Sequence, residues 1–388
     1  MVLKKHILKM IKLVSDTIDK SDINSLVEWL SQDEIPKLTK GNITIEFEKK
    51  WSEKIGINHT TFVNSGSSAI LLSLAALKES TMLKNMKIVV PSLSWLTDVS
   101  SPIQLGYDVI LCDCNMDDLS IDIEHFKQII KDEDPGCLIL VSVLGFVPNM
   151  DEIVNICKEN NIVLIEDVCE SMGSKYNDKY LGTFGDISVF SLYYGHHLST
   201  IEGGFVCTNN SELNDIIVSM RSHGWSRDWS IDKQEEYRKK YNISEFDSLY
   251  SFYYPGFNLR STDLQAFIGL SQIDKLDDFS IKRNDNFNTY INNININELD
   301  IKINGFVSNF AYPIVSKNKK SIVEELIKNN IEVRPLIAGS MMNKPFWKGR
   351  KSYLKNCEII DKYGFYIPNH QGLSSNDIEK ICNIINKK

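Results

Sequence analysis

Short apolar segments rich in β-branched residues alternate with segments of helical length between about residue 60 and residue 210. Apolar strands separated by helices of this length are typical of βαβ units, whose mostly parallel sheet is covered by helices on both faces. The sequence therefore predicts an α/β fold. The segments predicted as strands are 60–63, 87–90, 108–113, 137–143, 162–167, 187–192 and 203–208.

The C-terminal part of the chain has a different pattern, typical of a small α+β domain. We expect residues 1–255 to form an N-terminal segment and a large α/β domain, and residues 256–388 to form the small domain. The polar, highly charged segment 227–251 is interpreted as an excursion or mobile loop. The elements expected beyond it are a long helix near 262–295, a strand at 310–315, a helix at 321–330, a strand at 331–336 and a last helix capped by Ser374 or Ser375.

The charge balance and the N-terminal residues limit the classes of partner. The 388 residues include 43 Lys+Arg and 51 Asp+Glu, a net charge of −8 without a basic block, which argues against nucleic acid as the main partner. No apolar run approaches the roughly 20 residues that span a bilayer. Lys9 and Lys12 interrupt the apolar part of MVLKKHILKMIKLV, which therefore indicates an amphipathic surface helix rather than a signal peptide. We expect a cytoplasmic protein that is not inserted in a membrane.

The eight cysteines are interpreted as buried, reduced thiols, because most lie inside apolar runs. Only Cys112 and Cys114 are closely spaced, and no second pair completes a zinc or iron–sulfur quartet. We predict no metal site.

Two motifs lie where a predicted strand ends. The turn Asn64–Ser68, with sequence NSGSS, precedes a helix, so it is either an anion site made by backbone N–H groups or an ordinary turn with a serine N-cap. Glu166 and Asp167 end a buried strand, where an acid can hold a protonated ring nitrogen or can cap the following loop. The residues alone leave both pairs of alternatives open.

Two further motifs carry polar side chains after a strand and before a helix. SLYYGHHLSTIEGG holds the adjacent histidines His196 and His197, without the HxH or HxxxH spacing of a metal site. YYPGFNLRSTDLQA places Asn258 and Arg260 before a helix, where a turn and a capped helix are the alternative.

In combination and in order, these motifs resemble the DegT/DnrJ/EryC1/StrS family of sugar aminotransferases, which are fold-type I pyridoxal phosphate enzymes. The resemblance runs from near residue 40 to near residue 370 and implies that fold for this chain. The motifs that carry it are NSGSSA, PSLSW, IEDVCESMG, FSLYYGHHLSTIEGG, RSHGW, PGFNLRSTDLQAFIGL and IEVRP.

One position departs from the family pattern, which reads Ser-Phe-His-x-x-Lys before Glu-Gly-Gly. Alignment on Ser191 and Glu202 places His196 where the family lysine anchors the cofactor, and no lysine lies between Lys179 and Lys233. Imidazole cannot form a stable imine with the cofactor aldehyde, but it remains a base near neutral pH.

With a histidine at this position, the chain resembles the 3-dehydratases of the family, which act on GDP-4-keto-6-deoxymannose. These enzymes belong to dideoxysugar biosynthesis for lipopolysaccharide O-antigen. The resemblance implies a cofactor that alternates between pyridoxal 5′-phosphate and pyridoxamine 5′-phosphate, with L-glutamate as amino donor. The enzyme would remove the C3 hydroxyl of a nucleotide-linked 4-keto-6-deoxy sugar and release a 3,6-dideoxy-4-keto sugar and ammonia.

The resemblance also implies roles for single residues. Trp95 would stack on the cofactor ring, Asp167 would pair with its ring nitrogen, and Asn258 would reach its phosphate from the partner subunit of a homodimer with shared active sites. Glu170 stands where aminotransferases of the family carry Gln or His, and its role is open. The residues expected to hold the phosphate are Gly66, Ser67, Ser68 and Ser191, and the candidates for substrate phosphates are His223, Arg227, Arg260 and Arg334.

Two alternatives to the dehydratase remain. One is an ordinary nucleotide-sugar aminotransferase, and the other is a catalytically silent binding protein that keeps the fold. The dehydratase is favoured because the residues expected to hold the cofactor are all present and only the lysine is replaced.

Overall fold

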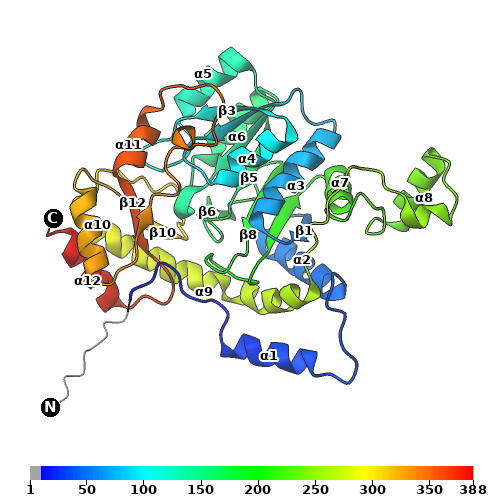
Figure 1. The fold of residues 1–388 in the computed structure, drawn as a ribbon, viewed down its shortest axis with the longest axis horizontal. Coiled ribbons are helices and arrows are strands. Elements are labelled where there is room, and N and C mark those ends of the chain that lie inside the picture. Colours follow the sequence, from blue (N-terminus) through cyan, green and yellow to red (C-terminus); the bar gives the residue numbers. More distant parts are fainter. Residues whose placement is uncertain (1–9, 388) are drawn as a thin grey trace.

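The structure, a computed structural model, describes residues 10–387, and its centre is a seven-stranded sheet with the order β1-β9-β8-β5-β4-β2-β3 (Figure 1). Only β9 runs opposite to the others, because it pairs antiparallel with both β1 and β8 while the remaining pairs are parallel. The predicted mostly parallel sheet is confirmed. The strands are β1 His59–Val63, β2 Lys87–Pro91, β3 Asp108–Cys112, β4 Cys137–Val141, β5 Val163–Asp167, β8 Ile187–Ser191 and β9 Gly204–Thr208.

Helices connect these strands and cover the sheet. Because crossovers between parallel strands are right-handed as a rule, the strand order puts α3 and α4, which pack against each other, on one face and α5 and α6 on the opposite face. The helices of this part are α1 Lys20–Leu30, α2 Asn42–Ile55, α3 Gly66–Glu79, α4 Leu96–Leu105, α5 Ile123–Glu133, α6 Met150–Glu159 and α7 Ser211–Arg221. Shorter elements are the 3₁₀ turn Val143–Gly145 and the hairpin of β6 Lys175–Tyr176 and β7 Lys179–Tyr180.

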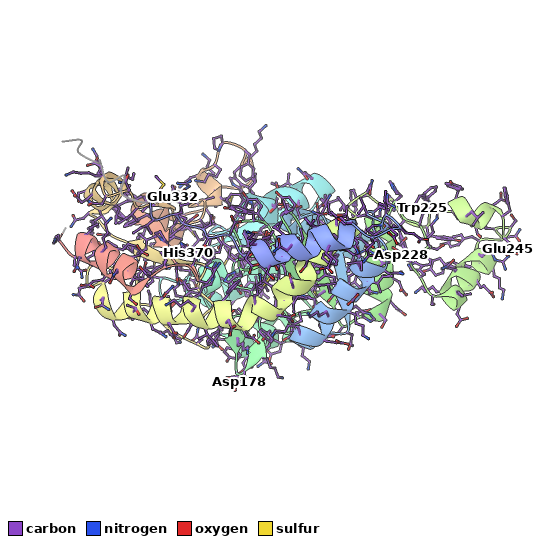
Figure 2. The ribbon with its side chains drawn as sticks, turned by 90° about the horizontal axis from the view of Figure 1, so that it is seen from below. Asp178, Trp225, Asp228, Glu245, Glu332 and His370 are labelled. Carbon is purple, nitrogen blue, oxygen red and sulfur yellow. The ribbon has the colours of Figure 1, made fainter. Side chains whose placement is uncertain are left out.

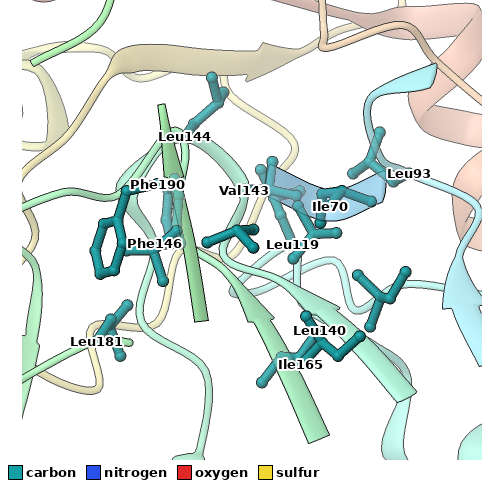
Figure 3. Close-up of a cluster of buried hydrophobic side chains, with 14 of the residues drawn as sticks. Ile70, Leu93, Leu119, Leu140, Val143, Leu144, Phe146, Ile165, Leu181 and Phe190 are labelled. Carbon is teal, nitrogen blue, oxygen red and sulfur yellow. The ribbon is translucent and has the colours of Figure 1, made fainter. Parts of the chain in front are cut away.

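The core lies between the sheet and its helices, and every residue of β4, β5, β8 and β9 is buried. Figure 3 shows part of it, with Ile70 of α3, Leu140 of β4 and Ile165 of β5 among the buried side chains. Burying one such side chain stabilises the fold by about 2 kcal/mol. The strand ends, and the polar side chains that follow them, are therefore held by a large apolar interior.

A second, three-stranded sheet with the order β10-β12-β11 forms the C-terminal part. Its central strand, β12, was not predicted, and the predicted strand at 331–336 is reduced to the two residues of β11. Ser374 is the N-cap of the last helix, as one of the two predicted alternatives. The elements are α9 Asp263–Asn293, β10 Ala311–Val315, α10 Lys319–Lys328, β11 Arg334–Pro335, the 3₁₀ turn Met341–Asn343, α11 Lys355–Tyr363, β12 Gly364–Pro368 and α12 Ser375–Ile385.

The sequence predicted a surface helix in the first 14 residues. For residues 10–14 this prediction is wrong, and residues 1–9 lie outside the described residues. Ile11 forms a parallel bridge with Ile331, and its N–H donates to the carbonyl of Asn330 at 2.9 Å. Ile11 and Leu13 are both buried. The extended conformation is favoured for two reasons. The region of the small sheet offers hydrogen-bond partners to the backbone, and it buries the apolar side chains.

The charged segment 227–251 projects from the body (right side of Figure 1). It contains α8 Ile231–Lys240, none of whose residues is buried, and the 3₁₀ turn Asp247–Tyr250. Across the described residues, no helix combines the length and apolarity that a bilayer crossing requires.

All eight cysteines are free thiols, and all except the half-buried Cys169 are buried, which confirms their interpretation. Asp113, Cys114 and Cys357 place potential ligand atoms within 4.8 Å of one another. The Asp113 carboxylate, however, accepts the backbone N–H groups of Cys114, Asn356 and Cys357 at 2.8–3.0 Å. It therefore caps the N-terminus of α11.

Candidate active site

The carboxyl ends of the parallel strands meet at one edge of the large sheet, where a cavity of about 480 Å³ opens. Ligands of parallel α/β sheets bind at this edge because side chains from several strand ends converge there. The N-terminal segment and the small sheet region close the other sides. Of the predicted site residues, the cavity is lined by Gly66, Ser67, Trp95, Asp167, Glu170, Ser191, His196 and Arg334.

The turn before α3 combines both interpretations that the sequence left open. The Ser65 hydroxyl accepts the Ser68 N–H at 3.0 Å, so Ser65 is the N-cap, while Gly66 and Ser67 line the cavity. A Cβ added at Gly66 would lie 2.8 Å from the Cβ of Ser191, so only glycine allows the turn to lie this close to β8. The helix N-terminus and the Ser191 hydroxyl thus face one end of the cavity, as an anion site requires. Ser68 is engaged in the cap and does not line the cavity.

Glu166 and Asp167 point to opposite faces of the sheet, because successive strand residues alternate. Asp167 lines the cavity, and its carboxylate accepts the Cys169 N–H at 2.8 Å. Glu166 accepts the N–H groups of Gly182, Phe184 and Gly185 at 2.7–2.8 Å. The loop-capping interpretation therefore holds for Glu166, and Asp167 is the acid that faces the cavity.

His196 has a defined tautomer. Its Nδ1 lies 2.6 Å from the carbonyl oxygen of Cys169. A carbonyl only accepts, so Nδ1 carries the proton and Nε2 keeps a free lone pair. Burial lowers the pKa of His196 to about 4, the Arg283 charge acts in the same direction, and the hydrogen bond to Cys169 opposes both. The imidazole is therefore neutral near pH 7.

The second histidine has a structural environment. His197 is fully buried, and its Nε2 donates to the Ser308 carbonyl oxygen at 2.8 Å. It does not line the cavity. Of the two adjacent histidines, only His196 can therefore act on a bound molecule.

Glu170 can change its protonation state near neutral pH. Its Oε2 accepts the Leu144 N–H at 3.1 Å. Burial raises the pKa of Glu170 to about 7; the hydrogen bond from Leu144 lowers this pKa, and the charge of Asp167 raises it. Trp95 lines the same cavity as Asp167 and Glu170 and presents an aromatic ring to it; the residue is 56% exposed.

The other predicted residues do not line the cavity of their own chain. The Arg227 guanidinium stacks on the Trp225 ring at 3.9 Å, and Arg260 Nε donates to Asn258 Oδ1 at 3.2 Å. The His223 N–H donates to the Phe257 carbonyl oxygen. Figure 2 shows Trp225 toward the end of the molecule that carries Glu245, with Glu332 toward the opposite end. A role for His223, Arg227, Asn258 and Arg260 in a partner subunit's site stays a prediction.

Sequence reasoning missed the residues that close the cavity. Leu13 lies across it, held by its N–H donating to Glu332 Oε2 at 3.1 Å, and Glu332 also pairs with Arg334 at 2.6 Å. Glu332 was within reach, since it belongs to the quoted motif IEVRP. The cavity residues that no motif indicated include Leu13, Val14, Phe310 and Tyr366.

The arrangement fits a phosphorylated aromatic cofactor such as pyridoxal phosphate. The cradle at Gly66, into which no Cβ fits, and the start of α3 suit a phosphate. The Trp95 ring suits the face of a heteroaromatic ring, and the buried Asp167 carboxylate suits its protonated nitrogen.

A pH dependence of stability follows from the lowered pKa of His196. Between the ordinary value of 6.5 and about 4, the unfolded chain binds a proton at this residue that the folded chain does not. Folding stability should therefore fall as the pH is lowered through this window. Urea unfolding of the cofactor-free protein should show wild type losing up to about 1.4 kcal/mol per pH unit more than His196→Asn. Parallel pH curves for the two proteins would contradict the assignment.

Comparisons with known proteins bear on this arrangement. The DegT/DnrJ/EryC1/StrS aminotransferase family matches residues 16–386. A GDP-4-keto-6-deoxy-D-mannose 3-dehydratase of Escherichia coli O55:H7 is 32% identical over 374 residues, which are 92% of this chain and 95% of the relative.

Two solved structures share the architecture. A histidine-to-asparagine mutant of GDP-4-keto-6-deoxymannose-3-dehydratase with bound GDP-perosamine has a TM-score of 0.87 and 29% identity, covering 97% of this chain and 100% of that chain. The same enzyme with a trapped PLP-glutamate geminal diamine has a TM-score of 0.84 and 28% identity, covering 97% of this chain and 100% of that chain.

Proposed function

Because the chain belongs to the DegT/DnrJ/EryC1/StrS aminotransferase family, with its fold-type I architecture and pyridoxal phosphate dependence, we propose that it is a nucleotide-sugar 3-dehydratase. It would remove the C3 hydroxyl of a nucleotide-linked 4-keto-6-deoxy sugar, with GDP-4-keto-6-deoxymannose as first candidate. L-glutamate would be the amino donor, and the products would be a 3,6-dideoxy-4-keto sugar and ammonia. The substrate named for the similar enzymes and the glutamate adduct trapped in one of them support this proposal.

The observation that carries the proposal is the neutral His196 in the cavity, with Nδ1 bound to a carbonyl and Nε2 free. Among the described residues that line the cavity there is no lysine. A lysine would anchor the cofactor and return a proton to it, which completes transamination. An imidazole can move the proton but cannot form the covalent anchor, which favours loss of the hydroxyl.

The residues that would hold the cofactor are Gly66, Ser67 and Ser191 at its phosphate, Trp95 at its ring face and Asp167 at its ring nitrogen. When bound, the cofactor supplies an electron sink that stabilises negative charge on a neighbouring carbon. Phe310 and Leu13 place apolar groups around the cavity and limit the access of water.

His196 would serve as both base and acid. Its Nε2 accepts a proton from carbon, and the resulting imidazolium is stabilised because Nδ1–H still donates to the Cys169 carbonyl oxygen. The same Nε2–H then donates the proton to the departing C3 hydroxyl, which leaves as water. Arg334 also lines the cavity and is our candidate to bind an anionic group of a substrate.

The proposal includes a homodimer with shared active sites. The Asn258 and Arg260 side chains are hydrogen-bonded to each other and lie outside the cavity of their own chain. This agrees with a role in the partner subunit's site. A cytoplasmic location is likewise retained from the sequence.

The test is to incubate the cofactor-loaded protein with L-glutamate and a panel of GDP-, CDP-, UDP- and dTDP-4-keto-6-deoxy sugars. We expect ammonia and a product that has lost the C3 oxygen for one member of the panel. A product that has gained an amino group would instead identify an aminotransferase. No change in the cofactor absorbance after glutamate would identify a silent protein.

A second prediction concerns the missing covalent anchor. Borohydride treatment should leave no cofactor on the wild-type polypeptide, whereas His196→Lys should retain it, as seen by protein mass. Cofactor attached to the wild-type chain would contradict the role of His196.

A further inference from the structure

Asp98, which no motif indicated, follows Trp95 and Thr97, which line the cavity. It is the third residue of α4 and is 0% exposed. Its Oδ2 accepts the Trp95 N–H at 3.2 Å, so one oxygen is used in capping the helix whose N-cap is Trp95. Its other oxygen, Oδ1, is buried and accepts no hydrogen bond from any N–H or O–H group of the described residues.

Besides the Trp95 N–H, the polar group that interacts with the Asp98 carboxyl as a hydrogen-bond partner is the carboxyl of Asp167. Two carboxylate oxygens cannot hydrogen-bond unless one of them carries a proton, and two buried carboxylates in contact cannot both be charged. Burial, followed by the charges of Asp167 and Glu170, raises the pKa of Asp98 well above its ordinary value. The nearby thiol of Cys169, whose pKa is also raised by burial and by these acids, adds no positive charge.

We propose that Asp98 is a protonated carboxylic acid that donates a hydrogen bond from Oδ1 to Asp167 and so fixes Asp167 as the carboxylate facing the ring nitrogen of the cofactor. Asp98 is a positioning residue, since it acts through Asp167. The part that concerns the cofactor rests on the proposed function. The proton on Asp98 is a property of the cofactor-free chain.

The arrangement gives Asp167 two fixed donors, the Cys169 N–H and the Asp98 O–H. The pair then carries a single negative charge, which a protonated ring nitrogen neutralises without a further proton. Removing the Asp98 donor raises the proton affinity of Asp167. This favours transfer of the ring proton from the nitrogen to Asp167, a step within the pair that releases no proton to solvent. Glu170 and His196 are the other titratable groups of the cavity that face this change.

The test compares Asp98→Asn with Asp98→Ala. The asparagine amide can accept the Trp95 N–H and donate to Asp167, whereas alanine can do neither. At constant pH, we expect the ratio of bound cofactor with a protonated ring nitrogen to cofactor with a neutral one, read from its absorbance, to fall about tenfold or more in Asp98→Ala and less than about threefold in Asp98→Asn. Pyridoxal phosphate affinity should fall about tenfold in Asp98→Ala and little in Asp98→Asn.

Infrared spectroscopy of the cofactor-free protein tests the proton itself. At neutral pH, the wild type minus Asp98→Asn difference spectrum should contain the carbonyl band of a protonated carboxylic acid. Asp228→Asn is the control: burial acts to raise the pKa of Asp228, but the charges of Arg221 and Lys40 outweigh it and lower this pKa, so the replacement should remove no such band.

A missing band, or an Asp98→Asn variant as impaired as Asp98→Ala, would overturn the proposal. The infrared result does not depend on the reaction, so it stands or falls separately from the 3-dehydratase assignment. It also needs only Asp98→Asn, should Asp98→Ala fail to fold.

Discussion

Replacing His196 with asparagine should lower the rate of dideoxysugar formation by about 10²–10⁴-fold, the contribution typical of a positioned general acid–base. Asparagine can still donate to the Cys169 carbonyl oxygen, but it cannot accept a proton from carbon. Pyridoxal phosphate affinity should change only a few-fold, because the groups at Gly66, Ser191 and Asp167 are untouched. The measurements are ammonia release under saturating substrate and cofactor titration by absorbance.

The matched control for this prediction is His59→Asn, the same replacement on β1. The His59 imidazole bonds the Ser211 hydroxyl and lies outside the cavity. This variant should keep the wild-type rate. A His196→Asn variant that binds cofactor and still releases ammonia at the wild-type rate would show that another group moves the proton.

Replacing Glu166 with alanine should destabilise the cofactor-free protein by about 3–5 kcal/mol. The Glu166 carboxyl is the acceptor for three backbone N–H groups of the loop 182–185, and it is 1% exposed. Its loss leaves the buried Gly182 N–H and the half-buried Phe184 and Gly185 N–H groups without this partner and opens a cavity, and each effect costs free energy. The free energy of unfolding, measured with urea, should fall by this amount.

Glu159→Ala is the control, because Glu159 is an exposed glutamate at the end of α6. It should change stability by less than about 0.5 kcal/mol. If Glu166→Ala lost less than about 1 kcal/mol, the loop would be held by other contacts and the capping interpretation would be wrong.

The large sheet could be predicted from the sequence because each of its strands is a short apolar run, and each of the seven predicted segments overlaps one of its strands. β12 was missed because GFYIP follows α11 without a connecting turn and ends in proline, so local signals do not separate it. The N-terminal residues failed for another reason. Their periodicity favours a helix, but pairing of Ile11 with Ile331 overrides it.

The site was predicted where motif residues stand at strand ends, as Asp167 and Ser191 do. It was not predicted where the relevant contact joins distant parts of the chain. The role of Asp98 depends on its contact with Asp167, and the role of Leu13 depends on its hydrogen bond to Glu332. Sequence spacing also could not show that Glu166 caps a loop while Asp167 faces the cavity, because the direction of each side chain depends on the pleat of β5.

The cavity is lined by residues as far apart in the sequence as Leu13 and Tyr366, so it forms only when the N-terminal segment and the three-stranded sheet have packed against the large sheet. A molecule that binds there therefore binds the folded chain and not the unfolded one. At 100 times its dissociation constant such a molecule protects the native chain by about 2.7 kcal/mol against proteolysis. Limited proteolysis with and without pyridoxal phosphate should show this protection.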